Sequence, residues 1–321
     1  MGVFTPVSAE ELTGFLTRYD LGKATTFKGV AEGVQNSNFM LDTDRGNRLF
    51  LTIYEDRVDA DDLPYFLALT THLADHGLPV PRPIPDRGGR ALQMLCGRPA
   101  CLIEFVPGVS VSVPTPADAF AAAAAMGAMH AALTDFAPTR ANEHGPDGWR
   151  RLATSIGDRF GTVAAGLVAM VDDELGALAM RWPDGLVRST IHADLFADNV
   201  LLLDGRVTGL IDFYFACTDL RAYDLAVMHG AWCFSPDGRT FDPAVAVALI
   251  AGYRSMHPLS EAEVAALPLL CRGAALRFML TRTYDWITTP ADALVTKKDP
   301  MAFARRLAWY RSATPAEILG A

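Results

Sequence analysis

The segment that most constrains this chain lies near its middle, between residues 191 and 212. It opens with the string His-x-Asp-x-x-x-x-Asn, whose three polar side chains are His192, Asp194 and Asn199. Two apolar runs follow, 200–203 and 207–211, and they flank the pair Asp204-Gly205, which favours a two-residue β-hairpin turn. The segment therefore predicts a polar loop followed by a tight hairpin that ends at Asp212.

The register of this hairpin suggests a metal site. Folding about Asp204-Gly205 places Asn199 opposite Leu210, so Asp212 becomes the diagonal neighbour of Asn199 on the same face. Such neighbours lie ~7–8 Å apart at the backbone, within reach of two short side chains. Mg²⁺ prefers one or two carboxylate or carbonyl oxygens together with water and nucleotide phosphates. We therefore predict that Asn199 and Asp212 ligate Mg²⁺, with Asp194 on the preceding loop directed at a different atom.

A single carboxylate beside a metal-binding Asn/Asp pair is typical of kinase-type phosphoryl transfer. One alternative is that His192 and Asp194 order a β-turn and Asp212 caps a strand, but this requires three independent spacings to coincide. A metal-dependent hydrolase is the other chemical interpretation, and it is weaker because no second histidine at a metal-ligand spacing lies nearby.

A candidate nucleotide cradle lies earlier, between two predicted strands. The loop 29–39 contains Gly29, Gly33 and Asn38, and glycines let backbone amides approach phosphate oxygens. The loop matches neither the Walker A string nor the dinucleotide fingerprint, and an ordinary glycine hairpin fits it equally well. The run 102–106 precedes Pro107-Gly108 and predicts a hinge, in which the backbone of Glu104 and Val106 bonds an adenine edge.

Hydrophobic periodicity divides the chain at Pro107-Gly108. With 321 residues, of which 50% are hydrophobic, the chain is long enough for about two domains. The first part alternates between elements: we expect helices at 8–16 and 63–73 and strands at 24–30, 38–42, 48–54, 91–95 and 100–106. The second part is mostly helical, with helices expected from 116 onward and at 148–160, 164–181, 225–232, 243–256, 261–284 and 299–312. The sequence predicts an α+β, bilobal protein with an antiparallel-sheet lobe at 1–107 and a helical lobe at 108–321.

Charge and cysteine content exclude several classes. The 28 basic and 37 acidic side chains give a net charge of −9, which argues against a nucleic-acid or anionic-membrane surface. The N-terminus lacks the features of a targeting segment, and the apolar run 119–132 is shorter than the ~20 residues that span a bilayer. The five cysteines show no C-x-x-C spacing, so neither a disulfide framework nor a zinc knuckle fits. We expect a cytoplasmic protein.

The chain resembles the protein-kinase-like family that includes aminoglycoside phosphotransferases and choline kinase, over nearly its whole length. Within that family it is similar to the homoserine kinases. The segments that carry the resemblance are 29–39 (GVAEGVQNSNF), 191–200 (IHADLFADNV), 209–217 (GLIDFYFAC), 277–286 (RFMLTRTYDW) and 298–300 (KDP). The H-x-D-x-x-x-x-N string is shared across the superfamily, whereas the full sequences of 191–200 and 209–217 are typical of a much smaller group within it.

The resemblance implies an ATP- and Mg²⁺-dependent kinase that phosphorylates the hydroxyl of L-homoserine on the threonine pathway. It implies that Asp194 is the catalytic base and that Asn199 and Asp212 ligate magnesium. For His192 we expect a hydrogen bond through its ring that orders the loop. Asp224 is expected both to brace the catalytic loop and to cap the following helix.

The third strand departs from the broad kinase pattern. Thr52 stands where kinases of this fold place a phosphate-binding lysine, and the homoserine kinases are similar in having another residue there. Lys28 and Arg48 are candidate substitutes, although an ordinary surface charge is the simpler interpretation of each.

The acceptor offers an ammonium, a carboxylate and a hydroxyl, so its site should contain charges of both signs. Arg277, Arg282 and Asp285 lie on one predicted helix, with the two arginines half a turn out of phase, so one of them is expected to face the cleft. An ordinary salt-bridged helix surface is the alternative. Other readings of the whole chain are a choline- or aminoglycoside-like kinase and a non-catalytic nucleotide-binding module. The expected partner is a small-molecule substrate, and the protein is expected to be a monomer or homodimer.

Overall fold

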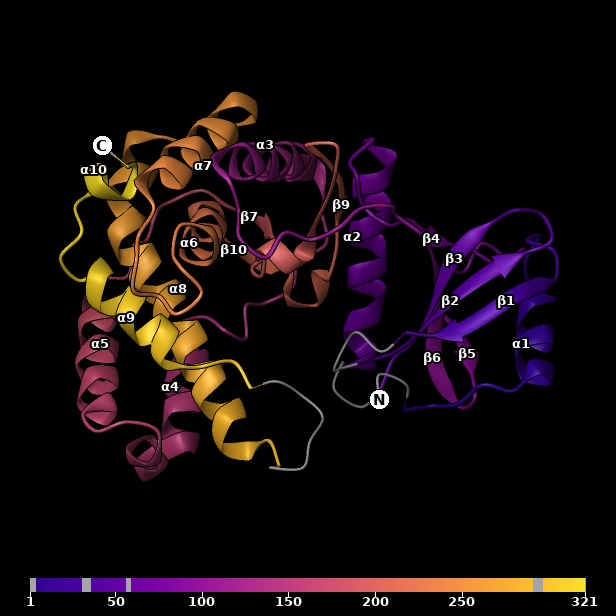
Figure 1. The fold of residues 1–321 in the computed structure, drawn as a ribbon, viewed down its shortest axis with the longest axis horizontal. Helices are drawn as coiled ribbons and strands as arrows, with labels where there is room; N and C mark the ends of the chain where they lie inside the picture. Colours follow the sequence, from indigo (N-terminus) through magenta and orange to yellow (C-terminus); the bar gives the residue numbers. More distant parts are fainter. Residues whose placement is uncertain (1–3, 31–35, 56–58, 291–296, 321) are drawn as a thin grey trace. The chain divides into compact units, whose positions relative to one another are not determined.

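The computed structural model describes residues 4–30, 36–55, 59–290 and 297–320 (Figure 1). Contacts between residues divide the chain into two compact units. The first comprises Met1–Pro107 and Thr208–Tyr214, and the second comprises Gly108–Val207 and Phe215–Ala321.

The first unit is built on an antiparallel sheet in the order β1-β2-β3-β6-β4, with β5 paired to β6. The strands are β1 (Ala24–Gly29), β2 (Ser37–Thr43), β3 (Arg48–Ile53), β4 (Pro83–Ile84), β5 (Gln93–Leu95) and β6 (Arg98–Glu104). Alternate residues of β2 are buried, as expected for a sheet with one face on the core. Leu41, Leu51 and Leu102 are fully buried in that core.

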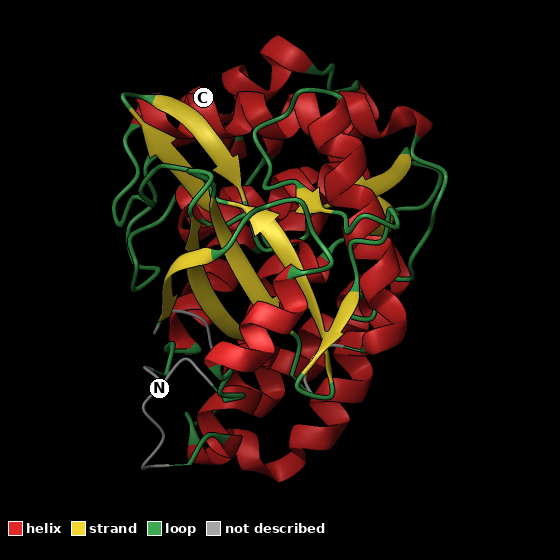
Figure 2. Ribbon diagram, turned by 90° about the vertical axis from the view of Figure 1, so that its right-hand side faces the viewer, coloured by secondary structure: helices red, strands yellow, loops and turns green. Residues whose placement is uncertain are grey.

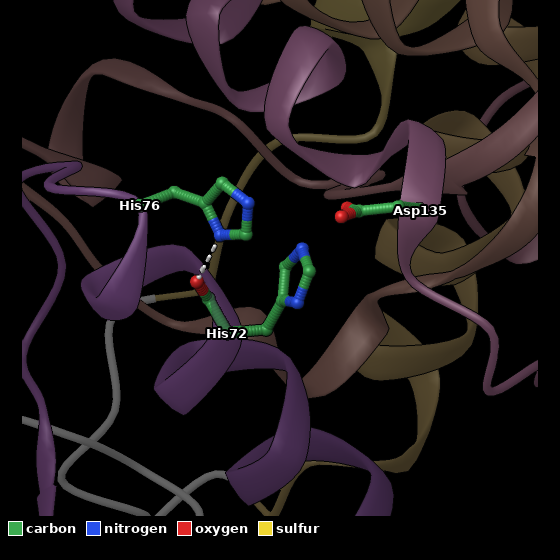
Figure 3. A group of neighbouring side chains, drawn as sticks. All are labelled: His72, His76 and Asp135. Carbon is green, nitrogen blue, oxygen red and sulfur yellow. Dashed lines mark hydrogen bonds between the residues drawn. The ribbon is translucent and has the colours of Figure 1, made fainter.

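Two helices accompany the sheet. The capping box predicted from Ser8 and Glu11 opens α1 (Ala9–Leu16), whose apolar side chains join the core of the sheet. The second helix is α2 (Leu63–Asp75), and Gly77 follows it with a φ of 75°, the conformation that a glycine after a helix typically adopts. At its end the Nδ1 of His76 donates to the carbonyl oxygen of His72 over 2.8 Å, satisfying one of the last carbonyls (Figure 3).

Residues 208–214 group with the first unit, whereas the sequence prediction assigned them to the C-terminal lobe. The Leu210 amide donates to the carbonyl oxygen of Pro79 over 2.7 Å. The ring of Tyr214 packs edge-on against the rings of Tyr54 and Phe66. These contacts are made between residues distant in sequence, which explains why periodicity along the chain did not reveal them.

The second unit is mainly helical, and helices are drawn in red in Figure 2. They are α3 (Pro116–Ala132), α4 (Pro146–Ile156), α5 (Leu167–Arg181), α6 (Arg221–Trp232), α7 (Pro243–Met256), α8 (Glu261–Thr288), α9 (Met301–Tyr310) and α10 (Pro315–Ile318). Thr115 and Ser260 head capping boxes at α3 and α8, as their sequences predict. Glycines allow α3 and α7 to approach closely, because a Cβ on Gly252 would collide with the carbonyl of Phe120.

The 28-residue helix α8 packs against α4, α6 and α9 (Figure 1). By length and composition alone it could cross a membrane, but 67% of its most apolar window is buried inside the protein. This burial is typical of the core helix of a soluble protein.

Two short two-stranded sheets form between residues 188 and 220. Strand β7 (Arg188–Ile191) pairs with β10 (Cys217–Leu220), and β8 (Val200–Leu203) forms a two-stranded sheet with β9 (Arg206–Leu210). Asp204 and Gly205 have φ values of 50° and 73°, so both turn residues are left-handed, as the Asp-Gly pair predicts. The sequence analysis did not predict β10.

Several titratable side chains are buried away from the polar loop. His229 on α6 is fully buried: its Nε2 donates to the Ile318 carbonyl over 3.0 Å, and its Nδ1 accepts from the Tyr310 hydroxyl at 2.5 Å. Burial lowers the pKa of His229 to about 4, although the bond to Ile318 opposes the shift.

All five cysteines are free thiols, and four of them are buried. Burial raises the pKa of Cys101 to about 11 and that of Cys217 to about 12.

Candidate active site

The polar loop follows β7 directly and turns sharply at Ala193. This alanine has a φ of 62°, a left-handed conformation that is uncommon for a residue with a Cβ. Such a conformation persists when surrounding contacts hold it in place. The loop is therefore held by its neighbours, and four side chains supply the contacts.

Asp224 on α6 is the first of these supports. Its two carboxylate oxygens accept the amides of His192 (2.8 Å) and Ala193 (2.7 Å). The Nε2 of His130, on α3, lies 3.1 Å from the same carboxylate. Asp224 is fully buried, which alone would raise its pKa, but the hydrogen bond and charge of His130 lower the pKa below its usual value. An ionised carboxylate thus anchors the loop backbone.

The expected capping role of Asp224 is wrong. Helix α6 begins at Arg221, and Leu220 occupies the N-cap position without a side-chain cap bond. Asp224 is therefore the fourth residue of the helix, and both of its oxygens are committed to the loop.

Arg277 is the second support, and it does not lie where an acceptor-binding residue was expected. Its Nη1 donates to the carbonyl oxygen of Ala193, and its guanidinium stacks on the rings of Phe278 and Phe215. Only 2% of the side chain is exposed. The sequence placed Arg277 and Arg282 on different faces of one helix, and Arg277 is the one that turns toward the loop backbone.

Two further contacts complete the loop. The indole Nε1 of Trp232 donates to the Leu195 carbonyl over 2.9 Å. The ring Nδ1 of His192 accepts the amide of Asp194 at 3.3 Å, and this is the loop-ordering bond expected of that histidine. His192 is itself fully buried, so its position is fixed by packing.

Asn199 connects directly to Asp194. Its Nδ2 donates to the Asp194 carbonyl (2.7 Å) and to the carboxylate Oδ2 (3.2 Å). Since both of these bonds use the amide nitrogen, the Oδ1 of Asn199 is the atom left to face a cation. A neutral carbonyl oxygen of this kind suits a hard cation such as Mg²⁺.

Asn199 lies at the start of the hairpin. It ends the 3₁₀ turn Ala197–Asn199 and directly precedes β8, so it belongs to the loop, and its expected place opposite Leu210 stays a prediction. Its bonds to Asp194 draw it into the loop. Asp212 follows β9 with a φ of 65°, which turns the chain sharply after the strand. The pairing of Asn199 with Asp212 around one ion stays a prediction.

The nucleotide-binding residues predicted in the first unit lie on neighbouring strands. Gly29 ends β1 and pairs with Phe39, whereas Gly33 lies outside the described residues. Thr52 on β3 is buried, and its hydroxyl donates to the Oδ1 of Asn38 on β2 over 2.9 Å. A neutral hydroxyl–amide pair thus stands at the position where a lysine would supply charge.

Neither candidate substitute for that lysine is buried beside Thr52. Arg48 is half-exposed and makes two bonds to the carboxylate of Asp42, at 2.7 and 3.2 Å. Lys28 lies exposed on β1.

The predicted hinge residues lie at the end of β6. The Glu104 amide is occupied, because it donates to the Arg82 carbonyl over 2.9 Å. Over the described ranges, the backbone of Val106 makes no hydrogen bond, so its N–H and C=O are free to pair with the edge of a base.

A cavity of about 630 Å³ opens beside the polar loop within the second unit. Phe196, Ala197 and Asp198 of the loop form part of its wall, and Arg282 of α8 forms another part. Its volume lies in the range typical of small-molecule sites. Asp285, the third expected acceptor-binding residue, is exposed and does not line this cavity.

Two residues of this region were not predicted from the sequence. His130 supports Asp224 across 94 positions of sequence and also bonds the Tyr253 hydroxyl. Arg306 of α9 lines the cavity and was not singled out. No local pattern marks either residue, because their partners are far away along the chain.

Comparison with known proteins gives consistent results. The sequence profile of the phosphotransferase enzyme family matches residues 26–259. The homoserine kinase of Gluconacetobacter diazotrophicus is 51% identical over 315 residues, covering 98% of both chains. That of Acidiphilium cryptum is 51% identical over 320 residues, covering 100% of both.

Among solved structures, the fold is similar to that of the amicoumacin kinase hAmiN, in a complex with AMP-PNP, Ca²⁺ and Ami. The TM-score is 0.72 at 16% identity, and the match covers 95% of this chain and 93% of the other. An ethanolamine kinase of Plasmodium vivax matches with a TM-score of 0.64 at 11% identity, covering 89% and 84% of the two chains. At these identities the likeness concerns the fold, which is that of protein-kinase-like phosphotransferases.

Proposed function

This chain belongs to the phosphotransferase enzyme family and to the homoserine kinases within it, and we propose that it transfers the γ-phosphate of ATP to the hydroxyl of L-homoserine. The products are O-phospho-L-homoserine and ADP, which places the reaction in threonine biosynthesis. The observation that carries the proposal is the immobilised loop around Asp194, combined with about 50% identity to homoserine kinases over the full length.

Asp194 acts as the base in this proposal. Its backbone is fixed on both sides: its amide is held by the His192 ring, and its carbonyl accepts the Phe196 amide (2.8 Å) as well as Asn199. A carboxylate fixed in this way orients the hydroxyl of the acceptor and accepts its proton as the bond to phosphorus forms. Positioning of this kind supplies much of the rate acceleration of a phosphotransferase.

Asn199 and Asp212 would hold Mg²⁺. The donor set fits, because it consists of one amide carbonyl and one carboxylate. When bound, the ion neutralises the charge that develops on the transferring phosphoryl group. Asn199 has a second role that requires no metal, since its amide fixes one oxygen of Asp194 at 3.2 Å.

ATP is expected to bind through the first unit. We propose that the backbone near Gly29 and Gly33 approaches the phosphates, that Asn38 and Thr52 line this region, and that the hinge at Glu104 and Val106 bonds the adenine. Thr52 brings no charge, so the phosphates must be neutralised by the metal and by backbone dipoles.

The cavity of the second unit would receive the acceptor, with Arg282 as the cation for its carboxylate. The remaining proposals concern the whole protein. They are a cytoplasmic location, a monomer or homodimer in solution, and no binding to nucleic acid or membranes, as its net charge of −9 favours.

The test is an ADP-release assay with L-homoserine, L-serine, L-threonine and choline, with the product identified by ³¹P NMR. We expect turnover with L-homoserine above all others. Preference for choline or an aminoglycoside would establish a different alcohol kinase. Phosphate release without an acceptor would indicate a hydrolase, and ATP binding without turnover would indicate a binding module.

The Asp194→Ala variant tests the base. It should lose about 10²–10⁴-fold in kcat while binding ATP almost normally, because general-base catalysis contributes factors of this size. The matched control is Asp204→Asn, which changes an acidic residue in the hairpin turn to one that tolerates the same left-handed backbone. Near-normal turnover by Asp194→Ala would show that the base is another group.

A further inference from the structure

The cavity beside the polar loop contains an unusual pair of arginines. The guanidinium of Arg306 lies over the ring of Phe303, 4.3 Å from its centroid, and that of Arg282 lies over the same ring at 4.5 Å. Both side chains line the cavity. We propose that Arg306, together with Arg282, is the binding site for the carboxylate of the acceptor amino acid, and that Phe303 holds the two guanidinium groups in place.

Arg306 has donors that the protein does not satisfy. Only 4% of the side chain is exposed. Its Nη2 donates to the Ser235 carbonyl over 3.0 Å, but its Nε and Nη1 have no hydrogen-bond partner among the described residues. Leaving buried donors unpaired is costly, and native proteins rarely do so without a reason. Because Nε and Nη1 are themselves buried, a ligand with acceptor oxygens would meet them once the Arg306 side chain turns into the cavity that it lines.

The charge of the pair points to an anion. Two guanidinium groups gathered at one ring repel each other, and burial lowers the pKa of each to about 10, with the charge of Arg306 as a further cause at Arg282. An ionised carboxylate bound to the pair would offset both penalties, since charge-assisted bonds of arginine to carboxylates are among the strongest in proteins.

The acidic side chains of the cavity wall are already engaged elsewhere. Asp242 caps α7 by accepting two backbone amides, and Asp198 pairs with the exposed Lys298 at 3.3 Å. The carboxylate of Asp299 accepts the Met301 amide and faces Arg305, so Arg282 reaches only the carbonyl of that residue. The charges of Asp299, Asp198 and Asp194 oppose the lowering of the Arg282 pKa, and that of Asp237 opposes the lowering of the Arg306 pKa. Three of these carboxylates, however, pair with other cations: Asp198 with Lys298, Asp299 with Arg305 and Asp237 with Arg239. A ligand carboxylate would give the arginine pair a direct partner.

The position of the pair suits a small amino acid with a terminal hydroxyl. Residues 196–198 of the loop line the same cavity, so a ligand held by its carboxylate at Arg306 lies beside the loop that carries Asp194. This inference rests on the proposed function, because the carboxylate in question belongs to L-homoserine.

The experiment compares L-homoserine with 2-amino-1,4-butanediol, which keeps the ammonium and the hydroxyl but lacks the carboxylate. The variants are Arg306→Gln, Arg306→Lys and Arg282→Gln. The matched control is Arg150→Gln, an exposed arginine of α4 that pairs with Asp147 and does not line this cavity. Steady-state kinetics give kcat/KM for both acceptors, and thermal shift with each acceptor in the absence of ATP measures binding without turnover.

We expect Arg306→Gln to lose about 10- to 150-fold in kcat/KM for L-homoserine, the effect of one or two bonds to a charged group. Its kcat/KM for the amino diol should stay unchanged, so the preference for the carboxylate disappears. Arg306→Lys should keep part of this preference, and Arg150→Gln should behave as wild type. If Arg306→Gln does not fold, a loss of preference in Arg282→Gln, together with a smaller loss in Arg306→Lys, carries the test.

An unchanged preference in folded Arg306 and Arg282 variants would overturn the inference while leaving the proposed function intact. If the wild-type protein does not phosphorylate L-homoserine, the proposed function fails, and thermal shift then decides on the site. Stabilisation by L-homoserine that depends on Arg306 would still support a carboxylate site. The carboxylate site would be refuted if inorganic phosphate stabilises the protein through Arg306 and L-homoserine does not displace the phosphate.

Discussion

Replacing Asp224 by asparagine tests whether the buried carboxylate controls the position of the base. The substitution keeps one acceptor oxygen but places an NH₂ group where the other oxygen accepted a backbone amide of the loop, at 2.7 or 2.8 Å. At least one buried N–H would then lose its partner, and the bond from His130 would lose its charged acceptor. Because the site is fully buried, we expect the free energy of unfolding to fall by about 3–5 kcal/mol.

The catalytic effect should be separable from this loss of stability. A shift of the loop by about 1 Å would misplace Asp194, and misplacement of this size costs about 10²-fold in rate. We expect Asp224→Asn to lose about that factor in kcat, measured by ADP release well below its unfolding temperature, with little change in the KM for ATP.

The matched control is Asp219→Asn. Asp219 is also buried, and it accepts the Leu220 amide (2.7 Å) and the Nδ2 of Asn142 (2.6 Å), with no described hydrogen bond to the loop. It should destabilise the protein and leave kcat near normal. A folded Asp224→Asn protein with normal kcat would refute the idea that this carboxylate positions the base.

Three further predictions concern packing, pH and metal. Gly273→Ala should destabilise the protein by about 1–3 kcal/mol in urea unfolding, because its Cβ would overlap the Trp182 ring, whereas Gly176→Ala, with nothing within 4 Å, should be neutral or stabilising. The pKa of His229 is about 4 in the folded protein and 6.5 for the free side chain, so the unfolded chain binds more protons between these values. The free energy of unfolding should therefore fall as the pH drops from 6.5 to 4, and in His229→Gln this fall should be smaller by about 3 kcal/mol. An identical pH dependence in the two proteins would contradict this prediction. EDTA should abolish turnover, and added Mg²⁺ should restore it. Asn199→Ala should need a higher Mg²⁺ concentration for its half-maximal rate, and an unchanged concentration would exclude Asn199 as a ligand.

Features that depend on neighbouring residues could be predicted from the sequence. The Asp204-Gly205 turn, the capping boxes at Ser8 and Ser260 and the helix start at Thr115 all rest on contacts within four residues, and the structure contains each of them. The start of α6 was placed too late, because Leu220 offers no capping side chain to mark it.

Features that depend on distant residues could not be predicted. The pair of His130 and Asp224 joins α3 to α6, and the stacking of Arg282 and Arg306 on Phe303 joins α8 to α9. Helical spacing did show that Arg277 and Arg282 face different directions. It could not show which of them meets the loop, because that depends on how α8 packs.

The sequestered thiols give this protein a built-in reporter of unfolding. Labelling requires the thiolate, which attacks the thiol reagent. The thiolate is scarce at neutral pH in Cys101 and Cys217, so labelling of these residues must wait until the surrounding structure opens. Since Cys101 lies in the first unit and Cys217 in the second, mass spectrometry of pulse-labelled peptides would time the opening of each unit separately.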